Sequence, residues 1–277
     1  MFGWEQHSLE TVTDEAILMM PLVWQQAFLG LLQGLTEFVP ISSSGHLAIA
    51  RAYLGMDPER NLATVAILHL GTLVSLTFCR GKDLMEVVVS KSPFRNIEFH
   101  ALLVTSLTTG LIYAGFRSFF DDAFSTPRIA GVGLVFTAFL LVYAELRKAK
   151  APRHLRHTRF FDWIMLGVLQ AFAILPGVSR SGATIAGGLL VGLDRKESVR
   201  FAFLLAFPPI VMGAILHGNE ILSFIKSNPL PSAVGFLVSL VTGIFAIKFM
   251  FQFVPKRRLE PFALYCLILG IVAALSR

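Results

Sequence analysis

The chain has 277 residues, of which 55% are apolar and only 15% are charged, and its mean hydropathy is +0.67. This composition, with long uncharged runs, is typical of helical proteins that cross a membrane several times, and it excludes a soluble domain. The net charge of +6 would suggest a nucleic-acid partner in a soluble protein. Here the basic residues lie in short loops between apolar runs, where they act as orientation signals, so we expect no nucleic acid to bind.

The first sixteen residues form an acidic lead. They contain no lysine or arginine, and their acidic side chains are Glu5, Glu10, Asp14 and Glu15. A cleavable signal peptide begins with a basic region. The sequence of residues 1–16 therefore predicts a short segment at the membrane interface rather than a signal peptide.

One segment of the chain occurs twice. The stretch from Leu29 to Asp57 aligns without a gap with the stretch from Leu166 to Asp194. In both copies proline, glycine and serines interrupt an apolar sequence, and paired broken segments of this kind indicate a membrane protein's binding site. The identical pairs are Leu29/Leu166, Gly30/Gly167, Leu32/Leu169, Gln33/Gln170, Ser42/Ser179, Ser44/Ser181, Gly45/Gly182, Gly55/Gly192 and Asp57/Asp194.

Six further apolar runs are long enough to cross a bilayer as helices, which takes about 20 residues each. They lie near 62–79, 99–117, 128–146, 200–217, 232–254 and 261–276. Lysine and arginine are concentrated in the loops 80–98, 147–160 and 255–260. Placing these loops in the cytoplasm lets every span alternate in direction and puts both termini outside.

The two repeated segments, 24–55 and 162–193, fit this scheme if each returns to the side from which it came. If each segment crossed the membrane twice in full, it would also return to the side from which it came. The arm from Gly45 to Gly55 is only about 16 Å long as a helix, however, which is half of a bilayer core. We therefore predict two re-entrant helical hairpins, whose serine and glycine tips meet near the middle of the membrane.

The predicted fold is all-α and polytopic, with six full transmembrane helices and the two hairpins. Three spans separate the hairpins, an odd number, so the second repeat (about 162–277) is inverted relative to the first (about 21–147). Gly131 and Gly133 permit close helix packing. This packing can lie within one chain or between two copies, so a homodimer stays open.

In the first copy, Gln33 and Glu37 are four residues apart and share one helix face. A carboxylate inside a membrane indicates function by default, because burying it unpaired is costly. Glu37 can bind a divalent cation with help from the Gln33 carbonyl, or act as a base. The alternative is a carboxylate paired with an arginine for structure alone.

The turn that follows Glu37 contains three serines, Ser42, Ser43 and Ser44, and then His46. Hydroxyls beside the free amides of a new helix form a cradle for an anion. An ordinary N-cap by Ser42 or Ser43 would explain only one of them. His46 is a candidate general acid, nucleophile or hydrogen-bonded core residue, whereas His69 and His100 have no such neighbours and are predicted to be structural.

The second copy repeats the cradle with Ser179 and Ser181 but has Arg180 where the first copy has Ser43. Arginine binds phosphate oxygens through a planar fork of donors, so an arginine at this depth predicts an anionic partner. The alternative is an ion pair with Glu37 and no ligand. Thr184, one turn further, adds another hydroxyl.

One carboxylate, one arginine, one histidine and several serines suffice for phosphoryl transfer, which depends mainly on positioning and charge neutralisation. Any metal would be a hard, oxygen-bound cation such as Mg²⁺ or Ca²⁺, because the sequence places no thiol or histidine pair suitably. The candidate phosphate ligands are Arg180, Ser179, Ser42, Ser44, Ser181 and Thr184.

These motifs, Gln33-x-x-x-Glu37 running into P-I-S-S-S-G-H and the later P-G-V-S-R-S-G-A-T, resemble the bacterial undecaprenyl-pyrophosphate phosphatase family, which is linked to bacitracin resistance. The resemblance covers Pro21 to Arg277. It implies hydrolysis of the polyprenyl pyrophosphate lipid to its monophosphate, which recycles the carrier for cell-wall synthesis. It also implies a divalent cation, the bacterial cytoplasmic membrane and a site open to the periplasmic side.

Carried over residue by residue, the resemblance assigns Glu37 and Gln33 to the metal and pyrophosphate site, although many members have glutamate in place of Gln33. Ser43 becomes the expected nucleophile and His46 its acid/base partner, while Ser179 and Arg180 bind phosphate. Direct attack by water or by His46 stays open.

A transporter or flippase for an anionic polyprenyl lipid is the competing prediction. Inverted repeats with broken helices also build the binding sites of secondary transporters. A transporter needs no nucleophile, so the difference between Ser43 and Arg180 in otherwise matching motifs favours an enzyme.

Overall fold

The computed structural model describes residues 22–54, 58–89, 96–123, 127–149 and 151–275. The acidic lead and the repeat positions Gly55 and Asp57 lie outside these residues. Every regular element in the described part of the chain is a helix, which confirms the all-α prediction. The helices are α2 (Leu22–Glu37), α3 (Ser43–Tyr53), α4 (Pro58–Val88), α5 (Ile97–Gly115), α6 (Arg117–Ala123), α7 (Pro127–Arg147), the 3₁₀ turn η2 (Leu155–His157), α8 (Phe160–Phe172), α9 (Arg180–Leu190), α10 (Arg195–Leu204), α11 (Phe207–Leu216), α12 (Gly218–Ser227), α13 (Pro229–Phe253) and α14 (Glu260–Leu275).

Within these residues, five helical stretches are long and apolar enough to cross a membrane: Leu62–Val88, Ile97–Gly115, Arg128–Arg147, Arg195–Leu216 and Pro229–Phe253. They coincide with the first five predicted spans. The sixth predicted span corresponds to α14, which has 16 residues and is about 24 Å long, against about 30 Å for a bilayer core. The count of six spans therefore stays a prediction.

Large apolar side chains cover the outer surface of these helices. They include Phe78 (76% exposed), Leu111 (72%), Ile215 (69%) and Phe139 (68%), which lie on four different helices. A soluble protein rarely exposes so many large apolar side chains. A membrane environment explains this surface, because lipid tails would cover it.

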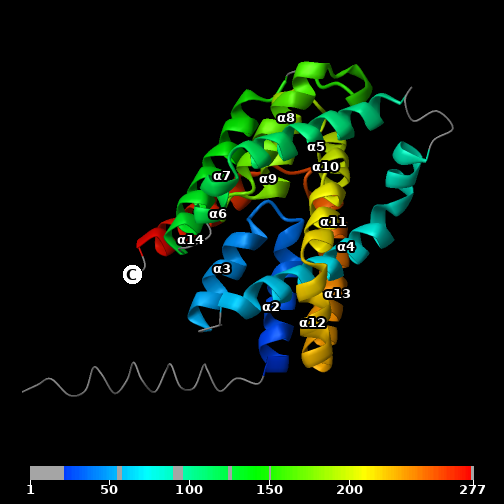
Figure 1. Cartoon of the computed structure of the whole chain (residues 1–277). Helices are drawn as coiled ribbons and strands as arrows, with labels where there is room; N and C mark the ends of the chain where they lie inside the picture. The colour runs from blue at the N-terminus through cyan, green and yellow to red at the C-terminus, as the bar shows by residue number, and fades with distance from the viewer. Residues whose placement is uncertain (1–21, 55–57, 90–95, 124–126, 150, 276–277) are drawn as a thin grey trace, which may run out of the picture.

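Two helical hairpins face each other across the molecule. In Figure 1 the hairpin of α2 and α3 (blue) lies below the hairpin of α8 and α9 (green), with the turns toward each other. Prolines at Pro40 and Pro176 prevent the first arm of each from continuing. Gly177 has φ +87, and a Cβ there would lie 1.9 Å from the Ala130 carbonyl oxygen, so only glycine fits.

The hairpins are held by long helices that pack closely against them. Helix α2 packs along α13, α8 along α5, and α7 along α14. Small residues allow these approaches: a Cβ on Gly34 would meet Thr242 of α13, and one on Gly131 would lie 2.5 Å from the Ala274 nitrogen of α14. The close packing that the sequence allowed at Gly131 and Gly133 is therefore made within the chain.

Candidate active site

The two hairpin turns contact each other directly. The Ser181 hydroxyl in the second turn donates to the Val39 carbonyl in the first, at 2.9 Å. A Cβ built on Gly45 would lie 3.1 Å from the Gly177 Cα. This contact brings the N-termini of α3 and α9, and the residues predicted for the site, into one region.

Ser42 and Ser179 cap the helices that follow them. Their hydroxyls accept hydrogen bonds from the backbone nitrogens of Gly45 (3.2 Å) and Gly182 (3.0 Å), as N-cap serines do. Ser42 has φ 68 and is the only residue other than glycine with positive φ in the described part of the chain. Such backbone strain costs about 1–3 kcal/mol and is found mainly at functional sites.

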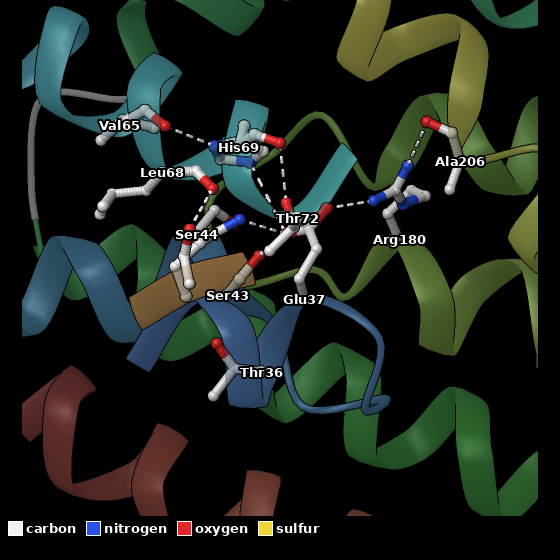
Figure 2. Close-up of polar contacts among 12 residues, drawn as sticks. Thr36, Glu37, Ser43, Ser44, Val65, Leu68, His69, Thr72, Arg180 and Ala206 are labelled. Atoms are coloured by element: carbon white, nitrogen blue, oxygen red, sulfur yellow. Dashed lines mark hydrogen bonds and ion pairs between the residues drawn. The ribbon is translucent and has the colours of Figure 1, made fainter. Parts of the chain in front are cut away.

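Glu37 is the centre of the polar contacts (Figure 2). Its side chain is only 4% exposed and forms an ion pair with Arg180. Its Oε2 atom accepts hydrogen bonds from Ser43 Oγ at 2.5 Å and from Gln33 Nε2 at 2.9 Å. The carboxylate therefore contacts Arg180, as expected if the ion pair is structural. It also contacts the Ser43 hydroxyl, as expected if Glu37 acts as a base.

Arg180, the first residue of α9, joins the two hairpins. One guanidinium nitrogen contacts Glu37 and the other donates to the Ala206 carbonyl at 3.0 Å. The side chain is 16% exposed. A guanidinium carries further N–H donors, so Arg180 can bind phosphate oxygens while it keeps these two contacts.

The other candidate phosphate ligands lie nearby but their hydroxyls are engaged with the protein. Ser181 donates to Val39, and Thr184 donates to the Arg180 carbonyl at 2.8 Å within its own helix. Ser44 is half-buried and its hydroxyl lies 3.2 Å from that of Ser42. A hydroxyl has a single proton to donate, so Ser181 and Thr184 would have to give up these bonds to bind an anion.

His46 lies away from the carboxylate. Its Nδ1 atom is 2.7 Å from the Ser42 carbonyl oxygen, and its Nε2 atom is 2.7 Å from the hydroxyl of Tyr265 in α14. The two rings are stacked. Because a carbonyl only accepts, Nδ1 carries a proton, and His46 links the strained turn at Ser42 to α14.

His69 lies beside Glu37 instead. Its Nε2 atom is 3.6 Å from Glu37 Oε2, and its Nδ1 atom is 2.8 Å from the Val65 carbonyl oxygen. The sequence predicted a structural role for His69 and did not associate it with the site. No rule of sequence spacing could have placed His69 at the site, because its position beside Glu37 depends on how helix α4 packs against the turn between α2 and α3.

A divalent cation fits these residues only together with a substrate. In the described residues no group of three or more His, Cys, Asp and Glu side chains could hold a metal ion. However, Gln33 Oε1 is buried with no hydrogen-bond partner, beside the Glu37 carboxylate. Mg²⁺ is commonly bound by one or two carboxylates, waters and substrate phosphates, and Glu37 with the Gln33 oxygen matches that pattern.

An arginine, a carboxylate and a serine hydroxyl, gathered where two broken hairpins meet among apolar helices, define a polytopic membrane protein with a buried cluster of polar and charged side chains. The chain belongs to the family described as bacitracin resistance protein BacA, whose model matches residues 26–272. This finding confirms the resemblance noted in the motifs.

Relatives that match over almost their whole length carry the name undecaprenyl-diphosphatase. The protein from Carboxydothermus hydrogenoformans is 36% identical over 90% of this chain and 95% of its own. The protein from Rubrobacter xylanophilus is 38% identical over 91% and 97%, and the protein from Korarchaeum cryptofilum 35% identical over 89% and 96%.

Proposed function

We propose that this protein hydrolyses undecaprenyl pyrophosphate to undecaprenyl phosphate and inorganic phosphate, and so returns the lipid carrier to cell-wall synthesis. Family membership and the name of the relatives support this substrate. The observation that carries the chemistry is the 2.5 Å hydrogen bond from Ser43 Oγ to Glu37 Oε2, beside the Arg180 guanidinium.

In the proposed reaction Ser43 Oγ attacks the terminal phosphorus while its proton passes to Glu37 Oε2. The Oγ–P bond forms and the bond from phosphorus to the bridging oxygen breaks, which releases undecaprenyl phosphate. Water then attacks the phosphoserine and frees inorganic phosphate. A base in hydrogen-bond contact with the nucleophile is the geometry that such covalent catalysis needs.

Charge on the phosphates is neutralised from two sides. Arg180 binds phosphate oxygens as a planar fork of donors. Helices α3 and α9 both direct their N-termini, which carry about half a positive charge each, toward the contact between the turns. These groups are fixed before the substrate arrives, which is what makes electrostatic stabilisation effective.

A divalent cation such as Mg²⁺ or Ca²⁺ would be held by Glu37 and the free Gln33 oxygen. When bound, it would act as a Lewis acid on the phosphoryl oxygens. Glu37 and Gln33 themselves lie one turn apart on α2, whose position is set by its close packing on α13.

Hydrolysis is favoured over lipid transport by the contact between Ser43 and Glu37. A carrier only has to bind its anionic lipid, and Arg180 with the helix N-termini would be enough for that. The Ser43 hydroxyl, which donates a hydrogen bond to the buried Glu37 carboxylate, is placed to act as an activated nucleophile. Transport does not need a nucleophile.

We further propose that α2–α3 and α8–α9 are re-entrant hairpins of an inverted repeat in the bacterial cytoplasmic membrane. The arms have 16, 11, 13 and 11 residues, which is short for a crossing of about 20 residues. Helix α2 packs on α13 and α8 packs on α5. In an inverted repeat α2 corresponds to α8 and α5 to α13, so each hairpin packs on a helix of the other repeat in the same way, which supports the proposal. The basic loops then face the cytoplasm, with both termini and the site opening outside.

The test is phosphate release from undecaprenyl pyrophosphate by detergent-purified protein, with and without EDTA. Ser43→Ala should lower turnover by about 10³-fold or more, whereas Ser223→Ala, at an exposed position of α12, should not. Near-normal turnover by folded Ser43→Ala protein would exclude serine attack. Folded wild-type protein that binds the lipid but releases no phosphate would exclude the function.

A further inference from the structure

His69 presents its Nε2 atom to the carboxylate of the site. Its Nδ1 atom lies 2.8 Å from the Val65 carbonyl oxygen, which can only accept, so Nδ1 carries a proton. The Nε2 atom faces Glu37 Oε2 at 3.6 Å and, in the neutral ring, holds a free lone pair. Figure 2 shows the ring between Val65 and Glu37.

The orientation of the His69 ring is compatible with metal binding through Nε2. Ligating histidines almost always donate their second ring nitrogen to a carbonyl or carboxylate, which fixes the tautomer and the ring orientation. A separation of 3.6 Å is too long for a hydrogen bond. Two ligand atoms that each lie about 2.1 Å from one shared ion are roughly 3.0 to 3.6 Å apart from each other. The separation between His69 Nε2 and Glu37 Oε2 falls at the upper end of this range.

The Gln33 side chain, which contacts the same carboxylate oxygen, offers a third potential ligand for a metal ion. Arg180 contacts Glu37 Oε1, whereas Gln33 and Ser43 contact Oε2, the oxygen that His69 faces. The Gln33 side chain also has a buried oxygen without a partner. Rotating this amide by half a turn exchanges its nitrogen and oxygen, and would aim that oxygen at the same point.

We propose that, before the Ser43 proton reaches Glu37, His69 Nε2 is a ligand of the divalent cation, together with Glu37 and Gln33, and that it makes the site prefer a first-row transition ion such as Mn²⁺ over Mg²⁺ and Ca²⁺. Mg²⁺ and Ca²⁺ take oxygen ligands, whereas imidazole favours transition metals. The expectation of Mg²⁺ or Ca²⁺ assumed oxygen donors alone. This inference deepens the proposed function and rests on it.

The experiment measures metal binding rather than turnover. Full-length protein in detergent, labelled with ¹⁵N-histidine, is titrated with Mn²⁺ in the presence of methylenediphosphonate and examined by pulsed electron paramagnetic resonance. Wild-type protein should show a histidine nitrogen coupled to Mn²⁺. His69→Gln should lose this coupling and weaken Mn²⁺ binding at least about tenfold, with a smaller change for Ca²⁺.

His100 gives a matched control, because its Nδ1 atom lies 3.0 Å from the carbonyl of Asn96, one turn back, as in His69. His100→Gln should keep both the coupling and the affinity. His69→Cys should gain affinity for Cd²⁺ relative to Mn²⁺, because thiolate prefers softer ions. Because an unfolded protein would not show this gain, the variant also tests whether the substituted site is folded.

The outcomes separate the two proposals. Unchanged Mn²⁺ affinity and coupling in His69→Gln, or no saturable Mn²⁺ binding by wild-type protein, would overturn the ligand role even if the enzyme releases phosphate. Mn²⁺ coupled to His69 in a protein that releases no phosphate would support the ligand and reject the hydrolase.

Discussion

Replacing Arg180 with glutamine leaves the Glu37 carboxylate buried without its ion-pair partner. The Glu37 and Arg180 side chains are 4% and 16% exposed, so solvent screens the pair weakly. Breaking a buried pair from one side costs about 3–5 kcal/mol. Because Gln33 and Ser43 still donate to Glu37, we expect the lower end of this range, about 3 kcal/mol.

The double variant Glu37→Gln/Arg180→Gln removes both charges and should recover most of this loss, because neutral replacements of a buried pair are often tolerated. Turnover should behave differently. Loss of one preorganised donor lowers kcat by about 10²–10³-fold, and loss of the base lowers it further. Stability and activity are therefore expected to separate in the double variant.

A second buried pair provides the control. Glu145 is fully buried, and Arg195 Nη2 lies 2.5 Å from both of its oxygens. This pair joins α7 to α10 and the α13–α14 loop, where the Leu259 nitrogen also donates to Glu145. Glu145→Gln should therefore destabilise the protein by a similar amount but leave kcat/KM of the folded fraction unchanged.

Unfolding would be followed in detergent by SDS titration, and phosphate release would be measured at equal folded fractions. If the double variant recovered turnover together with stability, the pair would be structural only. Arg180 would then have no role in binding phosphate, and the mechanism proposed for this site would be wrong.

Two further variants test the supports of the turns. Tyr265→Phe removes the hydrogen bond to His46 but keeps the stacked ring, and should lower the stability by about 0.5–1.5 kcal/mol; an unchanged melting temperature would contradict this contact. Gly133→Ala places a Cβ 2.3 Å from the Pro176 carbonyl oxygen and should cost about 1–3 kcal/mol and reduce turnover, because it displaces the turn that carries Arg180. Gly110→Ala, with nothing within 4 Å, should be neutral or stabilising by up to about 1 kcal/mol in the same thermal and phosphate-release assays.

The sequence predicted those features that depend on local pattern. Uninterrupted apolar runs indicated the five helical stretches that are long and apolar enough to cross a membrane, and Pro40 and Pro176 indicated where the hairpins turn. The repeat also brought Ser43 and Arg180 to equivalent positions, which made a common site at the tips a specific expectation. The sixth run, 261–276, is also a helix with nearly the same bounds, since α14 spans Glu260–Leu275.

Side-chain partners between distant helices could not be predicted in this way. His46 follows Ser43 closely in the sequence, but the first turn of α3 directs it to Tyr265. His69 is distant in the sequence, yet α4 places it beside Glu37. Neither contact leaves a periodic or spacing signal, because each joins residues on helices that are far apart in the sequence.

The residues that the two repeats share and the residues in which they differ have separate roles. The shared serines Ser42 and Ser179 cap their helices in the same way. Two positions that differ belong to the proposed catalytic site: Glu37 and Ser43 of the first hairpin correspond to Ile174 and Arg180 of the second.

Neither hairpin contains both the Glu37 carboxylate and the Arg180 guanidinium. The proposed site therefore requires contact between the two turns, through the Glu37–Arg180 ion pair and the bond from Ser181 to Val39. Ser181 is thus more important for assembling the site than for binding phosphate, since its only proton is donated to the opposite hairpin.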